Sequence, residues 1–280
     1  MNLHALARLV RAPAALTVPG DNLAGAAAAG RRPTLGLAAS SVCLYWAGMA
    51  LNDYADREVD ATERPQRPIP SGQVSPAVAL GVAVGLTGAG VALAAAAGGA
   101  GAVAIAVPLA GVIWAYDLRL KSTPAGPLAM AAARTLDVLM GAGIRGIPAA
   151  APTALTIGAH TAAITALSRR EVEGASPALP AAMLTATVGI GAAAFSRLRG
   201  NRVAAASLLA TYIGSVGQAD VAAMRDPAPK QMQRAVGAGI LGMMPLQAAL
   251  AAGSGALRSA IPIAAAFPLA RRLARRVSTT

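Results

Sequence analysis

The sequence predicts an all-α protein, a single polytopic bundle of about nine or ten transmembrane helices. The chain has 280 residues, of which 55% are apolar and only 13% are charged, and its mean hydropathy is +0.55. Soluble domains carry about 25% charged residues. Because a bilayer is crossed by roughly 20 apolar residues, that many spans would fill the chain. We therefore expect one integral membrane domain over residues 1–280.

The apolar stretches follow one another with short charged loops between them. They cover residues 12–30, 34–52, 75–97, 100–117, 124–144, 150–167, 177–196, 203–221, 236–252 and 257–270. The last two are short and contain Pro245, Pro262 and Pro268. They are the least certain spans, so the predicted number is nine or ten. Ala and Gly dominate these stretches, which predicts close helix packing through small side chains.

The basic residues are unevenly divided between the loops. If the N-terminus lies inside, the loops after the even-numbered stretches hold most of them: Arg57, Arg64, Arg67, Arg119, Lys121, Arg169, Arg170, Arg225, Lys230 and Arg234. Because basic loops stay in the cytoplasm, these loops are predicted to face it, and nearly all the carboxylates fall on the same side. The net charge of +12 therefore reflects membrane orientation and does not indicate a nucleic-acid partner.

Residues 51–76, LNDYADREVDATERPQRPIPSGQVSP, combine charges of both signs between two apolar stretches. Ionisable groups near membrane depth are costly and commonly mark a functional site. Asn52, Asp56 and Asp60 are spaced at i, i+4 and i+8, so on a helix they lie along one stripe, with Asp53 at its edge. Hard cations such as Mg²⁺ take oxygen ligands of this kind. The spacing therefore predicts a metal site.

Two arginines follow this stripe in the segment ERPQRPIPSG. The guanidinium groups of Arg64 and Arg67 can form paired hydrogen bonds with phosphate oxygens. The three prolines stiffen the loop. Carboxylates followed by arginines and a rigid turn predict a metal–diphosphate site rather than a solvated charged loop.

The stretch NDYADREVDATERPQRPIPSG resembles the first aspartate-rich motif of the UbiA family of intramembrane prenyltransferases, N-D-x-x-D-x-x-x-D followed by RP-x-RP. The resemblance implies a helical bundle that binds Mg²⁺ and an allylic prenyl diphosphate near the cytoplasmic face. It also implies transfer of the prenyl group to an aromatic or other lipophilic acceptor. By the same resemblance Asn52, Asp56 and Asp60 would hold Mg²⁺, with Asp53 assisting, and the two arginines would hold the diphosphate.

A second local resemblance follows the fourth apolar stretch, in YDLRLKSTPAGP. Tyr116 and Lys121 are similar to the tyrosine and lysine of a family loop in which the lysine, a compact point charge, meets the diphosphate. The alternative without a catalytic role is that Tyr116 lies at the membrane interface and that Lys121 is one of the cytoplasmic basic residues that set the orientation of the protein in the membrane. Together with Asp56 and Asp60, these two residues form the predicted catalytic set.

The sequence departs from the family after the sixth apolar stretch, where a second aspartate-rich motif is expected. The segment reads ALSRREVEGASP, whose carboxylates are Glu171 and Glu173. Two residues apart, they point about 200° from each other on a helix. Whether a second Mg²⁺ binds is left open. We expect Arg169 and Arg170 to neutralise the diphosphate, with Glu171 as a metal ligand or an arginine partner.

Five polar residues lie within the apolar stretches. Arg134 and Asp137 are three residues apart, so an ion pair within one helix is one interpretation. The other places Asp137, or Asp21 with Asn22, in an acceptor pocket. His160 is interpreted as a hydrogen-bonding packing residue.

These features predict Mg²⁺-dependent transfer of a prenyl group from a polyprenyl diphosphate to a lipophilic acceptor within the membrane lipid. The rival hypothesis is non-catalytic binding or transport of a polyprenyl phosphate, and a weaker one is an ordinary transporter. Soluble prenyl synthases are excluded by the apolar stretches, and membrane phospholipid alcohol transferases by the absence of D-G-x-x-A-R. The sequence fixes neither the acceptor nor the prenyl length.

Overall fold

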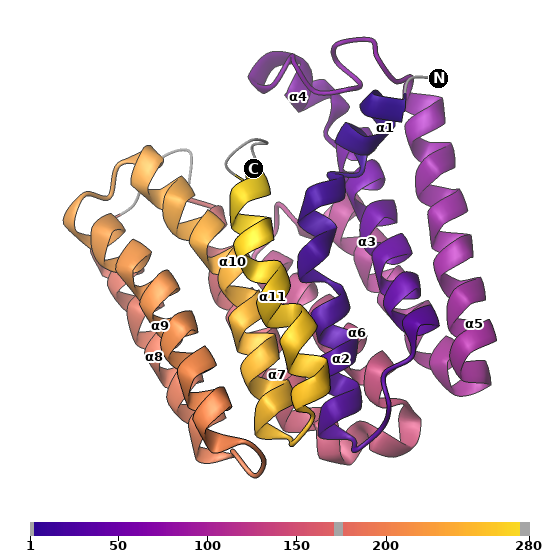
Figure 1. Ribbon diagram of the computed structural model, residues 1–280. Coiled ribbons are helices and arrows are strands. Elements are labelled where there is room, and N and C mark those ends of the chain that lie inside the picture. The colour runs from indigo at the N-terminus through magenta and orange to yellow at the C-terminus, as the bar shows by residue number, and fades with distance from the viewer. Residues whose placement is uncertain (1–2, 171–175, 275–280) are drawn as a thin grey trace.

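A computed structural model describes residues 3–170 and 176–274, and all regular structure in them is helical (Figure 1). The α-helices are α1 Leu3–Leu9, α2 Pro19–Ala28, α3 Leu35–Ala55, α4 Arg57–Glu63, α5 Pro76–Ala115, α6 Gly126–Ala142, α7 Ile147–Ser168, α8 Ala178–Ser196, α9 Arg202–Arg225, α10 Pro229–Gly253 and α11 Leu257–Ala274. Short 3₁₀ segments cover Ala12–Thr17 (η1) and Ile144–Gly146 (η3), and a π-helical turn covers Tyr116–Leu120 (η2). The predicted all-α class is confirmed.

Helix α5 consists of two antiparallel halves. Gly99 has φ 64° and ψ −159°, a backbone conformation that is essentially restricted to glycine. On either side of it, the Trp114 indole Nε1 donates to Thr87 Oγ1 at 3.1 Å. Because these residues are 27 positions apart on one nominal helix, the chain must reverse between them. The predicted stretches 75–97 and 100–117 correspond to the two halves.

Several helices are long and apolar enough to cross a membrane. By length and composition there are four in the described ranges, namely α3, the segment Pro76–Leu120, α8 and α10. Helices α6 and α7 bend by 105° where they join and qualify together as a fifth. The predicted count of nine or ten spans is not confirmed by this criterion, although most residues of each of the ten predicted stretches are helical.

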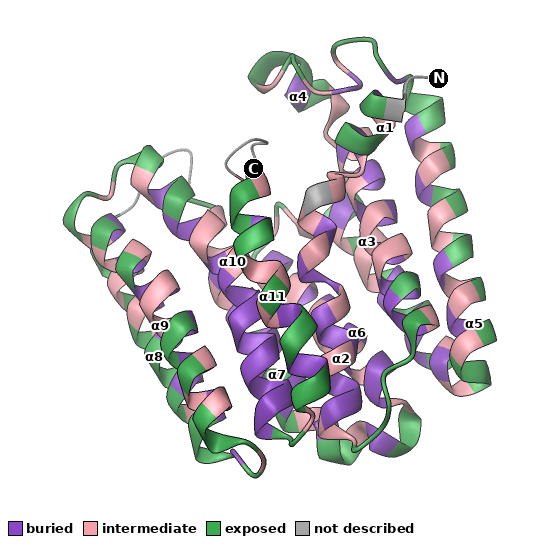
Figure 2. Ribbon diagram, viewed as in Figure 1, coloured by how far each residue is buried: buried purple, intermediate pink, exposed green. Residues whose placement is uncertain are grey.

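Helix α10 lies near the middle of the bundle, where Figure 2 shows most of its C-terminal half buried. Helices α8 and α9 lie on one side of it, and α3 and α5 form the opposite edge of the molecule (Figure 1). Helix α2 packs very closely on α6. A Cβ atom at Gly141 would overlap the backbone of Asn22, so only glycine fits at this contact. This close approach agrees with the prediction of small-residue packing.

The charged motif lies at one end of the bundle, and several of the connections between helices lie at the other end. In Figure 1, α1, α4 and the C-terminal end of α11 lie at one end. The connections 29–34, 197–201 and 254–256 lie at the other. Residues 51–76 and the turn that carries Lys121 therefore occur at the same end, as the sequence predicts for the acidic loops.

Candidate active site

The predicted metal stripe is interrupted at Asp56 but remains aligned. Helix α3 ends at Ala55, Asp56 is its C-cap with φ −89° and ψ 3°, and α4 begins at Arg57. Backbone hydrogen bonds nevertheless join the motif residues at helical spacing, from Asp56 N to Asn52 O at 2.9 Å and from Asp60 N to Asp56 O at 2.8 Å. The break between α3 and α4 is short, so Asn52, Asp56 and Asp60 remain on a common face of the two consecutive helices.

The predicted phosphate arginines contact the predicted metal ligands. Arg67 Nη1 lies 2.6 Å from Asp60 Oδ2 and 3.3 Å from Asp53 Oδ1, so one guanidinium bridges two carboxylates. Arg64 approaches Asp60 Oδ1 more distantly, at 3.7 Å. From the N-terminal segment, Arg11 Nη2 lies 3.3 Å from Asp53 Oδ1. Both aspartates are buried, so these cations neutralise charges that would otherwise be costly.

The tyrosine–lysine turn meets the same site. Lys121 Nζ lies 2.6 Å from Asp56 Oδ1. The π-helical turn is closed by the hydrogen bond from Lys121 N to Tyr116 O at 2.9 Å. Such a turn places both Tyr116 and Asp117 beside α3, and π-helical turns frequently occur at functional sites. Four predicted catalytic residues are thus brought to one end of the bundle.

Two site residues, Asp117 and Arg11, were not predicted. The Asn52 Nδ2 amide donates to Asp117 Oδ1 at 3.2 Å, and Arg11 Nη2 donates to Asn52 Oδ1 at 3.2 Å. Asp117 is only 3% exposed. The available signal for Asp117 was its position between Tyr116 and Lys121. No local pattern indicates Arg11, which reaches the site only through tertiary packing.

The segment after α7 is described only in part. Glu171 and Glu173, the predicted remnants of a second acidic motif, lie outside the described residues. Arg169 bonds the turn after η2, with Nη1 donating to Thr123 O and Nη2 to Ser122 O. Arg170 N donates to Leu167 O at 3.0 Å, which places Arg170 directly at the end of α7. The predicted diphosphate roles of Arg169 and Arg170 stay predictions.

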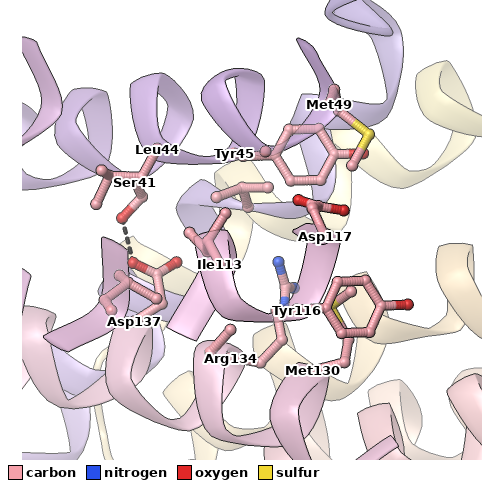
Figure 3. A pocket seen from close by; sticks show the side chains of 14 residues that line it. Ser41, Leu44, Tyr45, Met49, Ile113, Tyr116, Asp117, Met130, Arg134 and Asp137 are labelled. Atoms are coloured by element: carbon pink, nitrogen blue, oxygen red, sulfur yellow. Dashed lines mark hydrogen bonds between the residues drawn. The ribbon is translucent and has the colours of Figure 1, made fainter. Parts of the chain in front are cut away.

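An apolar pocket adjoins the charged site through Asp117, which accepts a hydrogen bond from Asn52 (Figure 3). Its lining residues come from the junction of η1 and α2, from α3, the second half of α5, η2 and α6: Val18, Ser41, Leu44, Tyr45, Gly48, Met49, Leu109, Ile113, Tyr116, Asp117, Met130, Ala133, Arg134 and Asp137. Tyr116 and Asp117 join it to the charged site. Ser41 and Asp137 form a polar group separated from them by Ile113 and Leu44 in Figure 3.

That polar group belongs to a buried network between α2, α3 and α6. The carboxylate of Asp137 accepts hydrogen bonds from Asn22 Nδ2, at 3.0 Å, and from Ser41 Oγ. Arg134 Nε lies 2.9 Å from Asp21 Oδ2. The predicted ion pair between Arg134 and Asp137 is therefore wrong. Because α2 packs directly on α6, Asp21 takes Arg134, and neutral donors serve Asp137 instead.

His160 lies in another buried network, away from the pocket lining. Its Nδ1 is 3.0 Å from the Tyr212 hydroxyl, and its Nε2 is 3.0 Å from Gly239 O. These contacts connect α7 to α9 and α10. The geometry supports the interpretation of His160 as a hydrogen-bonding packing residue.

The oxygen-rich side chains of the charged site fit Mg²⁺. Within the described ranges, no three Asp, Glu, His or Cys side chains converge closely enough to hold a metal by themselves. Mg²⁺, however, is usually held by one or two carboxylates together with waters and substrate phosphates. Asp60 Oδ1 is buried and accepts no hydrogen bond from the described residues, so it retains capacity for a ligand. Asn52 and the neighbouring aspartates supply the hard donors that this ion requires.

Comparison with known proteins finds a matching family model and curated relatives that match over short segments. The model of the UbiA prenyltransferase family matches residues 15–224. A curated relative, the digeranylgeranylglyceryl phosphate synthase of Methanothrix thermoacetophila, is 67% identical over 33 residues, which span 12% of this chain and 12% of that protein. The local match thus covers far less than two thirds of the relative.

Solved structures match over most of the chain. A UbiA homolog from Aeropyrum pernix K1 superposes with a TM-score of 0.62 at 18% identity, covering 84% of this chain and 96% of that one. A UbiA homolog from Archaeoglobus fulgidus bound to DMAPP and Mg²⁺ gives a TM-score of 0.58 at 14% identity, covering 86% and 98%. These likenesses show a shared helical fold.

Proposed function

The chain belongs to the UbiA prenyltransferase family, whose model matches residues 15–224, and we propose that it transfers a prenyl group from an allylic polyprenyl diphosphate to a lipophilic acceptor. The observation that carries the proposal is the meeting of Asp56 and Lys121 at 2.6 Å, beside an apolar pocket. Oxygen ligands and phosphate-binding cations from distant parts of the chain converge there. A prenyl diphosphate needs this combination, a polar site for its head and an apolar one for its tail.

The head of the substrate would be bound by two sets of side chains. Asn52, Asp53, Asp56 and Asp60 would hold Mg²⁺, and Arg64, Arg67, Lys121, Arg169 and Arg170 would contact the diphosphate. When bound, Mg²⁺ would neutralise negative charge on the departing diphosphate. Because Lys121 is ion-paired with Asp56, it can exchange this partner for a phosphate oxygen while the carboxylate turns to the metal. The net charge of the site then changes little as substrate binds.

The apolar pocket would hold the allylic end of the prenyl chain. Its walls are chiefly aliphatic and methionine side chains, including Leu44, Met49, Leu109 and Ile113. Such walls exclude water, which would otherwise capture the allylic cation. Tyr116 lies at the junction between this pocket and the charged site, where its hydroxyl can orient the leaving diphosphate.

The acceptor proposal follows from the names of relatives. Curated relatives with local matches are digeranylgeranylglyceryl phosphate synthases. A prenylated glycerol phosphate is therefore the first acceptor to test, and an aromatic acceptor is the second. With a glycerol acceptor, the hydroxyl oxygen forms the new bond as the carbon–diphosphate bond breaks, and the hydroxyl proton is lost.

We place the charged end at the cytoplasmic face, because the loops at that end carry most of the arginines and lysines. The nine or ten spans would then be α2, α3, the two halves of α5, and the helices from α6 onward. Labelling of single cysteines introduced in the connections 197–201 and 226–228 with an impermeant reagent on intact cells tests this. Only the first connection should react from outside.

The experiment on function uses purified protein, Mg²⁺ and radiolabelled geranylgeranyl or farnesyl diphosphate with a panel of acceptors. The proposal expects a prenylated product and released diphosphate, both lost in Asp56→Ala. Asp56→Asn and Asp60→Asn should each abolish Mg²⁺-dependent binding of the diphosphate substrate. Tight Mg²⁺-dependent binding without turnover of any acceptor would instead identify a binding or transport protein.

A further inference from the structure

Asp117 is a site carboxylate without a paired cation. Among the described residues, Asp53 is ion-paired with Arg11 and Arg67, and Asp56 is ion-paired with Lys121. Within the described residues Asp117 forms no ion pair of its own, and the two cations that act on it, Arg11 and Lys121, are already paired with Asp53 and Asp56. Burying a charged carboxylate that has no cation of its own costs free energy, unless a bound cation compensates its charge. The burial of Asp117 therefore indicates that a further cation binds next to it.

The position of Asp117 indicates where that cation lies. Asp117 Oδ1 is 3.2 Å from the amide nitrogen of Asn52, one of the predicted metal ligands. Figure 3 shows its carboxylate between Tyr45 and Tyr116, among the side chains that line the pocket. Gly48 of α3 lies against it, because a Cβ there would come within 3.6 Å of Asp117 Oδ2. The carboxylate is thus buried and directed toward the diphosphate side of the pocket.

Resting on the proposed function, we propose that Asp117 is a further metal ligand, which binds Mg²⁺ together with Asn52 and Asp56. These three side chains supply two carboxylates and an amide from two separate segments, the end of α3 and the π-helical turn. Substrate phosphate oxygens and waters would complete the coordination. In the same charged site, the buried Oδ1 of Asp60 has no hydrogen-bond donor among the described residues, so this oxygen is also left for a ligand.

This assignment accounts for a peculiarity of the sequence. After the sixth apolar stretch, the segment ALSRREVEGASP carries only glutamates as acidic residues, with two arginines directly before them. A carboxylate on the turn after α5 adds a metal ligand from the other side of the site. The alternative is that Asp117 only accepts the Asn52 hydrogen bond and so fixes that side chain. Direct measurement of metal affinity separates these two roles.

The test is a titration of Mg²⁺ by isothermal calorimetry into purified protein with saturating inorganic diphosphate. Asp117→Asn preserves the size of the side chain and should weaken Mg²⁺ binding by at least about tenfold. Asp220→Asn is the matched control. Asp220 is a buried aspartate of α9 that accepts a hydrogen bond from Thr187 at 3.2 Å and does not line the pocket. Its variant should bind Mg²⁺ as the unmodified protein does.

Asp117→Glu keeps the carboxylate and guards against a folding defect in the asparagine variant. Thermal unfolding of both variants reports on folding, and Asp117→Glu should retain more Mg²⁺ affinity than Asp117→Asn. Equal Mg²⁺ affinity in Asp117→Asn and the unmodified protein would overturn the assignment, even if turnover falls. If the unmodified protein binds no Mg²⁺ with diphosphate, the proposed function itself fails. Loss in Asp56→Asn but not in Asp117→Asn refutes only the role of Asp117.

Discussion

The Lys121 ammonium lies 2.6 Å from Asp56 Oδ1 and joins the turn after α5 to the end of α3. The side chains of Lys121 and Asp56 are 21% and 28% exposed, but the Lys121 Nζ atom itself is buried, so solvent screens the pair only in part. The pair therefore lies between a surface ion pair, worth about 0–1 kcal/mol, and a buried one, whose disruption costs about 3–5 kcal/mol. The contact also matters for ligand binding, because each partner has a proposed ligand of its own.

Lys121→Met should weaken binding of the prenyl diphosphate and should lower stability by less than the cost of about 3–5 kcal/mol for a fully buried pair. Removing a charge-assisted hydrogen bond to phosphate costs about 1.5–3 kcal/mol, which corresponds to roughly a tenfold to hundredfold loss of affinity. Lys230→Met, at an exposed position of α10, removes the same charge and serves as the control. Equilibrium binding of labelled substrate measures the effect. Equal losses in both variants would mean that the lysine acts only through net charge.

Arg67→Met should destabilise the fold far more than Arg57→Met. The Arg67 side chain is 13% exposed and bridges Asp53 and Asp60, so its loss leaves two buried carboxylates with weaker compensation. Breaking a buried pair from one side costs about 3–5 kcal/mol. Arg57 pairs with the exposed Glu58 at 3.3 Å, and its loss should cost less than about 1 kcal/mol. Denaturant unfolding in detergent measures both values. Similar values would contradict the bridging role.

The relationships that the sequence could anticipate are those whose geometry is local. Asn52, Asp56 and Asp60 could be placed on one side from their spacing alone, because backbone hydrogen bonds of helical type fix that relationship. The encounter of Asp56 with Lys121 was not local, and it was anticipated only through the resemblance of two motifs. The fold class followed from the apolar stretches. The reversal inside α5 was predicted as a gap between two of them, and Gly99 explains it physically.

The missed contacts depend on how helices pack. Arg11 reaches Asn52 across 41 positions of the chain, and no pattern in its own neighbourhood indicates that contact. One interpretation paired Arg134 with Asp137, three positions away, yet Arg134 pairs with Asp21 on another helix. The decisive feature is the close packing of α2 on α6, which a single sequence does not specify.

Gly99→Ala should destabilise the hairpin formed by the two halves of α5. Its φ of 64° and ψ of −159° lie where a side chain is strained, and such strain costs of order 1–3 kcal/mol. Gly111 provides the control, because it is helical and a Cβ there would meet nothing within 4 Å. Gly111→Ala should be neutral or stabilise by about 0.5–1 kcal/mol. Thermal unfolding in detergent compares them. A neutral Gly99→Ala would show that the reversal needs no glycine.

Arg134→Met and Asp21→Asn should each be strongly destabilising, whereas the double variant should be less so than their sum. Arg134 Nε lies 2.9 Å from Asp21 Oδ2, and Asp21 is fully buried. Each single change strands a buried charge at a cost of about 3–5 kcal/mol. The double change removes both charges, so a double-mutant cycle should report a favourable coupling of about 0.5–3 kcal/mol. Asp137 keeps its neutral donors, Asn22 and Ser41, in every variant. Additive effects within about 0.5 kcal/mol would show that the two side chains contribute independently, and Arg134 would then act mainly through its hydrogen bond to Thr17 O at 3.0 Å.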